Sequence, residues 1–166
     1  MTVTLNSAGG ASVPNWTLLQ STSATSVASV TFSGLSGYSN YRVAAHYLYG
    51  GIQVVNTAIQ INNDTGSNYA YWSLSLASTT SFTPATLDSA TSIPIISTNG
   101  VRGSFVCDID KAMLASPKNL VFSGGSSGWN NGEGSYSTSS SISSIKVFNT
   151  GGFTYGSGTF YLYGAN

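Results

Sequence analysis

The alternation of apolar and polar residues constrains this chain more than any other feature of its sequence. Runs of β-branched and aromatic residues alternate with Ser, Thr and Gly at a period of two, which is typical of half-buried strands. Ser, Thr and Gly interrupt nearly every window in which a helical period could develop. The sequence therefore predicts an all-β fold, and specifically an antiparallel two-sheet β-sandwich.

The expected strands are separated by clusters of Gly and Asn, which favour turns. We expect turns at 34–37, 50–51, 62–66 and 151–152, and one helical turn at 110–116. We expect strands at 2–5, 16–20, 27–32, 41–49, 54–61, 69–76, 93–96, 101–109, 119–122, 142–148 and 159–163.

The chain is of a length that normally forms one domain, so we expect residues 1–166 to be a single β-sandwich domain. Residues 1–15 are expected to form an amino-terminal arm or an edge strand. Residues 123–141 contain almost no aliphatic side chains, which predicts a long Gly/Ser-rich surface loop.

Charge is unusually scarce: charged residues make up 6% of the chain, and five basic residues balance five acidic ones. Soluble domains usually contain about 25% charged residues. The few Lys and Arg residues are scattered, so we expect no nucleic-acid partner. A neutral surface favours self-association. Cys107 is the single cysteine, which excludes an intrachain disulfide, and we expect neither a signal peptide nor insertion into a membrane.

Two acidic residues and one histidine are the candidates for catalysis. Asp108 and Asp110 lie two apart in an expected strand, so their side chains would share a face, as in an acid–base pair. We favour a structural role for both, because strands often carry polar residues on the solvent face. His46 has no second histidine as a partner. A packed or interface histidine is therefore favoured over a catalytic or metal-binding one.

A group of amide and carboxylate side chains surrounds the expected turn at 62–66. Their oxygens could bind calcium, but calcium loops with strong sequence signals contain more carboxylates than this. We favour an Asx turn, and we predict neither a metal site nor a cofactor. The group consists of Asn62, Asn63, Asp64 and Asn68.

Aromatic residues make up 12% of the chain, and most of them must belong to the core. Tyr and Trp combine an apolar ring with a polar group, which suits both subunit interfaces and sugar stacking. We expect the aromatic residues of the long loop, and those that follow the turn at 62–66, to be exposed. The candidate ligand or receptor contacts are Trp129, Tyr136, Asn130, Asn131, Tyr71 and Trp72, with Tyr69 as a further exposed aromatic residue.

Three segments resemble the small β-sandwich modules of bacteriophage virion structural proteins, such as tail-fibre and decoration modules. The carboxy-terminal segment combines an Ile-x-x-Ile strand at 142–147 with a closing strand at 156–164. The segment 61–69 is similar to one that these modules have at mid-chain, and Trp16 with residues 30–32 and 38–41 is like their opening positions. The matching motif residues are Asn63, Asp64, Gly66, Tyr69, Gly156, Ser157, Leu162, Tyr163 and Gly164.

The resemblance implies a jelly-roll-like sandwich at the surface of a virion, assembled in the host cytoplasm, usually trimeric and without enzymatic activity. Its expected partners are copies of itself, other virion proteins and a host-surface glycan. One hypothesis is a tail-associated protein that contributes to host attachment. The second is a decoration or cement protein that stabilises the capsid. The third is a free-standing carbohydrate-binding module, or a weak glycosidase that uses Asp108 and Asp110.

Overall fold

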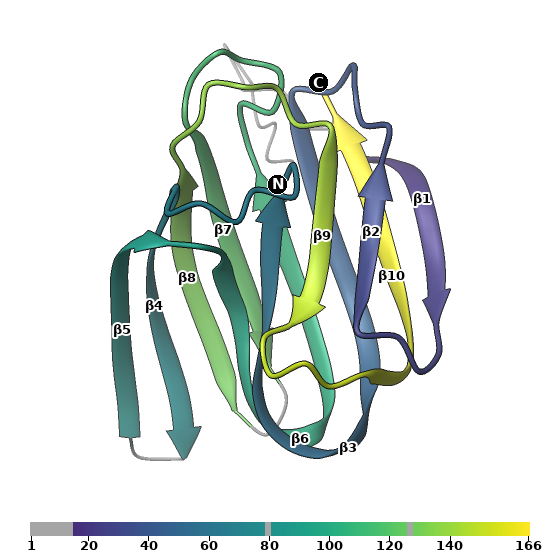
Figure 1. Ribbon diagram of the computed structural model, residues 1–166, viewed down its shortest axis with the longest axis vertical. Coiled ribbons are helices and arrows are strands. Elements are labelled where there is room, and N and C mark those ends of the chain that lie inside the picture. Colours follow the sequence, from purple (N-terminus) through teal and green to yellow (C-terminus); the bar gives the residue numbers. More distant parts are fainter. Residues whose placement is uncertain (1–14, 79–80, 126–127) are drawn as a thin grey trace, which may run out of the picture.

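The computed structural model describes residues 15–78, 81–125 and 128–166 (Figure 1). The expected strand at 2–5 and the arm up to residue 14 lie outside the described residues. The strands are β1 (Thr17–Ala24), β2 (Ser29–Ser33), β3 (Asn40–Ile61), β4 (Tyr69–Ser78), β5 (Ser81–Ala90), β6 (Ile93–Ile109), β7 (Lys118–Gly125), β8 (Trp129–Tyr136), β9 (Ser144–Asn149) and β10 (Tyr155–Ala165).

The strands form two antiparallel sheets, of eight and four strands, which confirms the predicted all-β sandwich. The larger sheet has the order β1-β10-β3-β6-β7-β8-β4-β5, and the smaller one consists of β2, β9 and parts of β3 and β6. In Figure 1, β9 and β2 lie in front of the larger sheet. Strands β3 and β6 belong to both sheets, because these two long strands pass together from one sheet into the other.

The turn expected at 50–51 is wrong, because β3 continues through these two glycines. The β3–β6 ladder shifts its register between Leu48 and Gln53, where the ribbon bends toward the second sheet. Glycine in a strand often marks such a bend instead of an end. The strands expected at 41–49 and 54–61 are therefore one strand, as are those expected at 93–96 and 101–109.

The core lies between the two sheets and is rich in aromatic rings. The ring of Tyr47 stacks on that of Phe160 with 5.6 Å between centroids, and it meets the ring of Tyr155 edge-on at 4.9 Å. The Tyr47 hydroxyl lies 2.7 Å from Oγ1 of Thr57, so a polar contact joins the two parts of β3. Full burial of each large apolar side chain contributes about 1.5–3 kcal/mol. Further buried residues come from the smaller sheet: Val30, Phe32, Ile59, Ile61, Ile145 and Val147.

The long surface loop expected at 123–141 is wrong. Residues 123–125 complete β7, and β8 follows over Trp129–Tyr136, paired with both β7 and β4. The sequence of β8 lacks aliphatic residues at its inward positions because side chains of neighbouring strands fill the space beneath two of its glycines. A Cβ at Gly132 would lie 2.5 Å from the Phe122 ring, and a Cβ at Gly134 would lie 2.7 Å from Ile93.

Strand β5 forms one edge of the larger sheet and lies at the left of Figure 1, away from β2 and β9. The sequence did not predict this strand. Its residues from Thr83 to Ser89 are all exposed, so no buried face produces an alternating pattern. Pro84 lacks a backbone N–H, which is tolerated on an edge strand.

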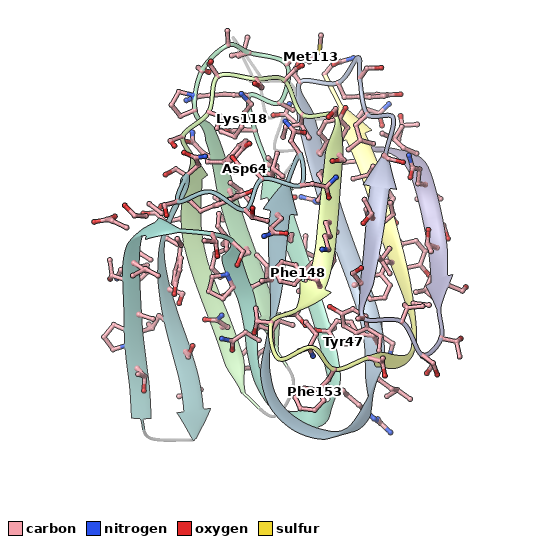
Figure 2. All side chains as sticks on the ribbon, viewed as in Figure 1. Tyr47, Asp64, Met113, Lys118, Phe148 and Phe153 are labelled. Carbon is pink, nitrogen blue, oxygen red and sulfur yellow. The ribbon has the colours of Figure 1, made fainter. Side chains whose placement is uncertain are left out.

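The helical turn expected at 110–116 is a hydrogen-bonded turn without helix, in which Lys111 has a positive φ of 57°. The Lys118 side chain is buried beneath this turn and donates to the carbonyl of Leu114 at 2.7 Å and to that of Ser116. Burial lowers the pKa of this ammonium group. Figure 2 shows the exposed Met113 at the end of the molecule, above Lys118.

Candidate functional site

The face of the larger sheet that points away from the smaller sheet, here called the outer face, is the broadest surface on which candidate residues gather. Its side chains form rows across the strands, because cross-strand partners point to the same side of a sheet. One row runs through Leu18, Tyr163, Arg42, Asp108, Val121, Glu133, Trp72 and Thr86. The next row runs through Tyr161, Ala44, Val106, Ser123, Asn131 and Leu74.

Large apolar side chains lie exposed on the outer face. Trp129 is 63% exposed, Val121 61%, Trp72 46% and Val106 40%. Isolated exposed apolar residues are ordinary, whereas these four gather on one sheet face. The sequence predicted the two tryptophans as contacts but not Val106 and Val121, because only the register of the sheet places these four side chains on one face.

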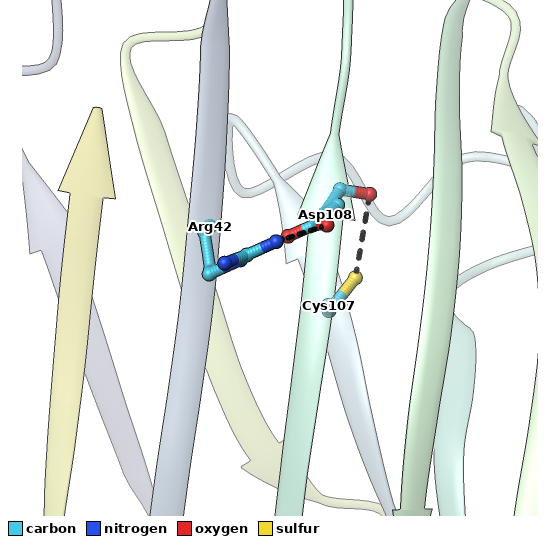
Figure 3. Close-up of polar contacts among 3 residues, drawn as sticks. All are labelled: Arg42, Cys107 and Asp108. Atoms are coloured by element: carbon cyan, nitrogen blue, oxygen red, sulfur yellow. Dashed lines mark hydrogen bonds and ion pairs between the residues drawn. The ribbon is translucent and has the colours of Figure 1, made fainter. Parts of the chain in front are cut away.

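The central charges of the outer face neutralise each other. Arg42 of β3 donates from Nε and Nη2 to the two carboxylate oxygens of Asp108 of β6, at 2.6 and 2.7 Å (Figure 3). This contact raises the pKa of Arg42 above its usual value. The Arg42 guanidinium also lies 4.4 Å from the centre of the Trp16 ring. Beside this pair, the buried Cys107 points into the core, and burial raises the pKa of its thiol.

Asp108 and Asp110 are each hydrogen-bonded to a residue of a neighbouring strand. Asp108 is held by Arg42, while the carboxylate of Asp110 accepts from the backbone N–H of Asn119 at 3.0 Å and from its side-chain amide at 3.3 Å. Both carboxylates hold neighbouring strands together, as the structural interpretation of the sequence predicted.

His46 is exposed on the outer face, so the packed position considered for it is wrong, while a position at an interface stays a prediction. It is aligned with Thr159 of β10 on one side and with Ser104 of β6 on the other. An exposed imidazole between two hydroxyl-bearing residues is suited to hydrogen bonding with a polar ligand.

Shallow grooves cross the outer face within the described residues, and four of them differ in their lining. The first, of about 540 Å³, is lined by Trp72 and three acidic residues, Asp88, Asp110 and Glu133. Another, of about 520 Å³, includes Trp72, Asp108 and Glu133, and a smaller one, of about 350 Å³, includes Asp108 and Asp110. The remaining groove, of about 590 Å³, is lined by Trp129, Tyr161, Tyr163 and His46 and by no acidic residue.

The structure divides the predicted contact residues into two groups. Trp129, Trp72 and Asn131 are exposed on the outer face, and Tyr71 is half-buried against the core. The predicted exposure of Tyr136, Asn130 and Tyr69 is wrong, because all three are buried.

Contacts within the chain account for the buried positions of Tyr136, Asn130 and Tyr69. The Asn130 amide donates to the carbonyl of Ile95 at 2.9 Å, and its Oδ1 accepts from Ser75 at 3.0 Å. The rings of Tyr69 and Tyr136 stack with 4.8 Å between centroids. These residues position strands and do not face a ligand.

Asp64 is the centre of the predicted turn at 62–66, and the Asx turn is confirmed. Its Oδ1 accepts from the backbone N–H of Gly66 at 2.8 Å, and its Oδ2 accepts from the Asn68 amide at 2.8 Å and from the Tyr136 hydroxyl at 3.0 Å. The hydrogen bond from Gly66 is the main cause that lowers the pKa of Asp64. Both oxygens of the Asp64 carboxylate therefore have hydrogen-bond partners within the chain.

Asn62 links this turn to the segment that precedes β9. Its amide donates to the carbonyl of Ser141 at 2.9 Å, and its Oδ1 accepts from the backbone N–H groups of Ser143 and Ser144 at 2.8 and 3.2 Å. Two motifs that are far apart in the sequence, 61–69 and 142–147, are therefore joined by one side chain. Asn63 beside it is exposed, and both asparagines have a positive φ.

The closing strand β10 places its motif residues in three settings. Leu162 is fully buried, while Tyr163 lies on the outer face beside Arg42. Gly156 lies at a register shift of β10, next to the exposed Ser157. A Cβ at Gly164 would lie 2.6 Å from the Tyr38 ring, so the strand can pass this ring only as glycine.

Fold and surface together define a two-sheet β-sandwich protein whose outer face exposes large apolar side chains. Within the described residues there is no group of three or more His, Cys, Asp or Glu placed to hold a metal ion. The same residues include no helix that is long and apolar enough to cross a bilayer. No protein-family model matches the chain, and no curated protein matches it significantly.

Proposed function

We propose that this protein is a non-enzymatic structural component of a bacteriophage particle, exposed at the particle surface, tail-associated and contributing to host attachment through the outer face. The observation that carries the proposal is the pair of exposed tryptophans, Trp72 and Trp129, on one face of the larger sheet. Aromatic rings on a flat surface suit contact with another molecule and need no catalytic group.

Two further observations support the proposal. The hydrogen bonds of Asn62 bring together two of the segments on which the resemblance to virion modules rests, 61–69 and 142–147. The carboxylates considered for hydrolysis, Asp108 and Asp110, are both engaged by neighbouring strands. These engagements favour a binding surface over a glycosidase.

Immunogold electron microscopy tests the proposed function without assuming a ligand. An antibody raised against the purified chain is applied to intact particles from the culture that produces the protein, and antibody absorbed with the chain serves as the control. We expect label at the tail end. Label over the head would replace the attachment function with that of a decoration protein. Particles without label would overturn a role in the virion.

A further inference from the structure

The groove with Trp129 and Tyr161 differs from the other three grooves in its chemistry. It crosses five neighbouring strands, from Tyr161 on β10 through β3, β6 and β7 to Trp129 on β8. Neighbouring strands lie about 4.8 Å apart, so four steps separate the two aromatic residues by roughly 19 Å. A ligand that contacts both rings must be elongated and must lie across the strands.

The floor between the two rings is low because its residues are small. Ala44 lies opposite Tyr161 in the ladder, and Gly125 lies opposite Trp129. A Cβ at Gly125 would lie 2.6 Å from the carbonyl oxygen of Gly128, so no side chain larger than that of glycine fits at this position. Val106, between these two ends, adds an exposed apolar surface.

Polar groups are spaced along the same floor. His46, Ser104 and Ser123 are exposed, and they come from β3, β6 and β7 in turn. Within the described part of the chain, no hydrogen bond engages these three side chains. One imidazole and two hydroxyls can donate to and accept from ligand hydroxyls without requiring a charge.

The electrostatics of the four grooves indicate the class of ligand. Acidic residues line the grooves around Trp72 and the groove beside Asp110, whereas the groove between Trp129 and Tyr161 has none. Its lining also lacks Lys and Arg, so it offers no counter-charge to an anionic ligand. An uncharged ligand rich in hydroxyl groups and with apolar ring faces fits this lining.

We infer that this groove binds a neutral oligosaccharide chain laid across the strands, with sugar rings stacked on Trp129 and Tyr161. Hydroxyls of the intervening sugars bond to His46, Ser104 and Ser123. The inference rests on the proposed function, because it names the ligand class and the part of the outer face that an attachment protein would use.

A glycan microarray with neutral, anionic and cationic bacterial surface polysaccharides tests this site on the purified full chain. We expect binding to neutral members of the array, and at least a tenfold weaker affinity for Trp129→Ala, which is about 1.4 kcal/mol. Leu18→Ala is the control, since it removes an exposed apolar side chain from the same face but outside this groove. Its affinity should stay within about twofold of the wild type.

Several outcomes would overturn the inference: no bound neutral glycan, binding confined to charged members, or equal affinities of Trp129→Ala and the wild type. Light scattering on the same samples examines the competing occupant, a second copy of the chain. An oligomer that dissociates in Trp129→Ala would make the groove a subunit interface. Because the array uses the purified chain, its failure is distinct from failure of the proposed function, which immunogold labelling tests on particles.

Discussion

Asn62 connects the end of β3 to the segment before β9 through hydrogen bonds on both sides of its amide group. We expect Asn62→Ala to lower the free energy of unfolding by about 2–3 kcal/mol, because it leaves backbone groups of that segment unpaired and keeps an unfavourable positive φ. Urea unfolding measures the loss. Asn63→Ala is the control, since Asn63 has a similar φ but an exposed side chain. Equal losses in both variants would show that φ alone matters.

Asp64 makes the same region sensitive to acid. Its pKa in the folded protein is below its ordinary value of 3.8, chiefly because Gly66 and Asn68 donate to the carboxylate. Its contribution to stability is therefore present above about pH 4 and is lost as the pH falls through the lowered pKa. We expect the wild type to lose more stability than Asp64→Asn between pH 5 and pH 2 in urea titrations.

The control for this acid titration is Asp88→Asn, which removes an exposed carboxylate from edge strand β5. We expect it to follow the wild-type profile. Parallel losses in the wild type and in Asp64→Asn would contradict the role of the Asp64 hydrogen bonds.

At the scale of single residues, sequence reasoning located the turn and the exposed tryptophans but not the full site. The Asx turn could be predicted because its donors and acceptors are close in sequence. The burial of Tyr136 could not, because Asp64 and Tyr69, its partners, belong to other elements. Exposure of a strand residue depends on what covers it, and this information is not local.

Strand β8 is the element whose composition conceals it most. Its inward-facing glycines are required by the large side chains of other strands. We expect Gly132→Ala to destabilise the protein by about 1–3 kcal/mol, because the added methyl group meets the Phe122 ring and the carbonyl oxygen of Trp72. Thermal unfolding measures the effect. Glu133→Ala changes the next position of β8, which faces outward, and should have a small effect. A loss of stability in Glu133→Ala as large as that in Gly132→Ala would contradict overpacking as the cause.

Strands with one buried, aliphatic face were predictable, and those without one were not. The sequence located most strands of the two sheets, including those expected at 27–32 and 119–122. It missed β5, which is exposed from Thr83 to Ser89, and β8, whose inward positions include Asn130 and two glycines. It also divided β3 in two, because a Gly-Gly pair permits a bend as well as a turn.

The ribbon of β3 and β6 makes the two sheets parts of one structure, so we expect them to unfold together. Val147→Ala in β9, in the smaller sheet, removes a fully buried side chain and should cost roughly 2 kcal/mol. The described tryptophans lie on the larger sheet, and Trp fluorescence should therefore report an earlier urea midpoint in this variant. Hydrogen exchange of β9 should follow the same midpoint. An unchanged fluorescence midpoint would indicate sheets that unfold independently.

The pairing of β1 with β10 determines how the molecule responds to pulling. Thr17 at the beginning of β1 lies opposite Gly164 near the end of β10, so both strand ends are at the same end of the sheet. The hydrogen bonds of an antiparallel pair run perpendicular to the strands. Tension applied through both ends would open this ladder one pair at a time, as in a zipper, instead of loading all pairs in shear. If the protein were attached through only one of these two strand ends, the hydrogen bonds between β1 and β10 would carry no tension.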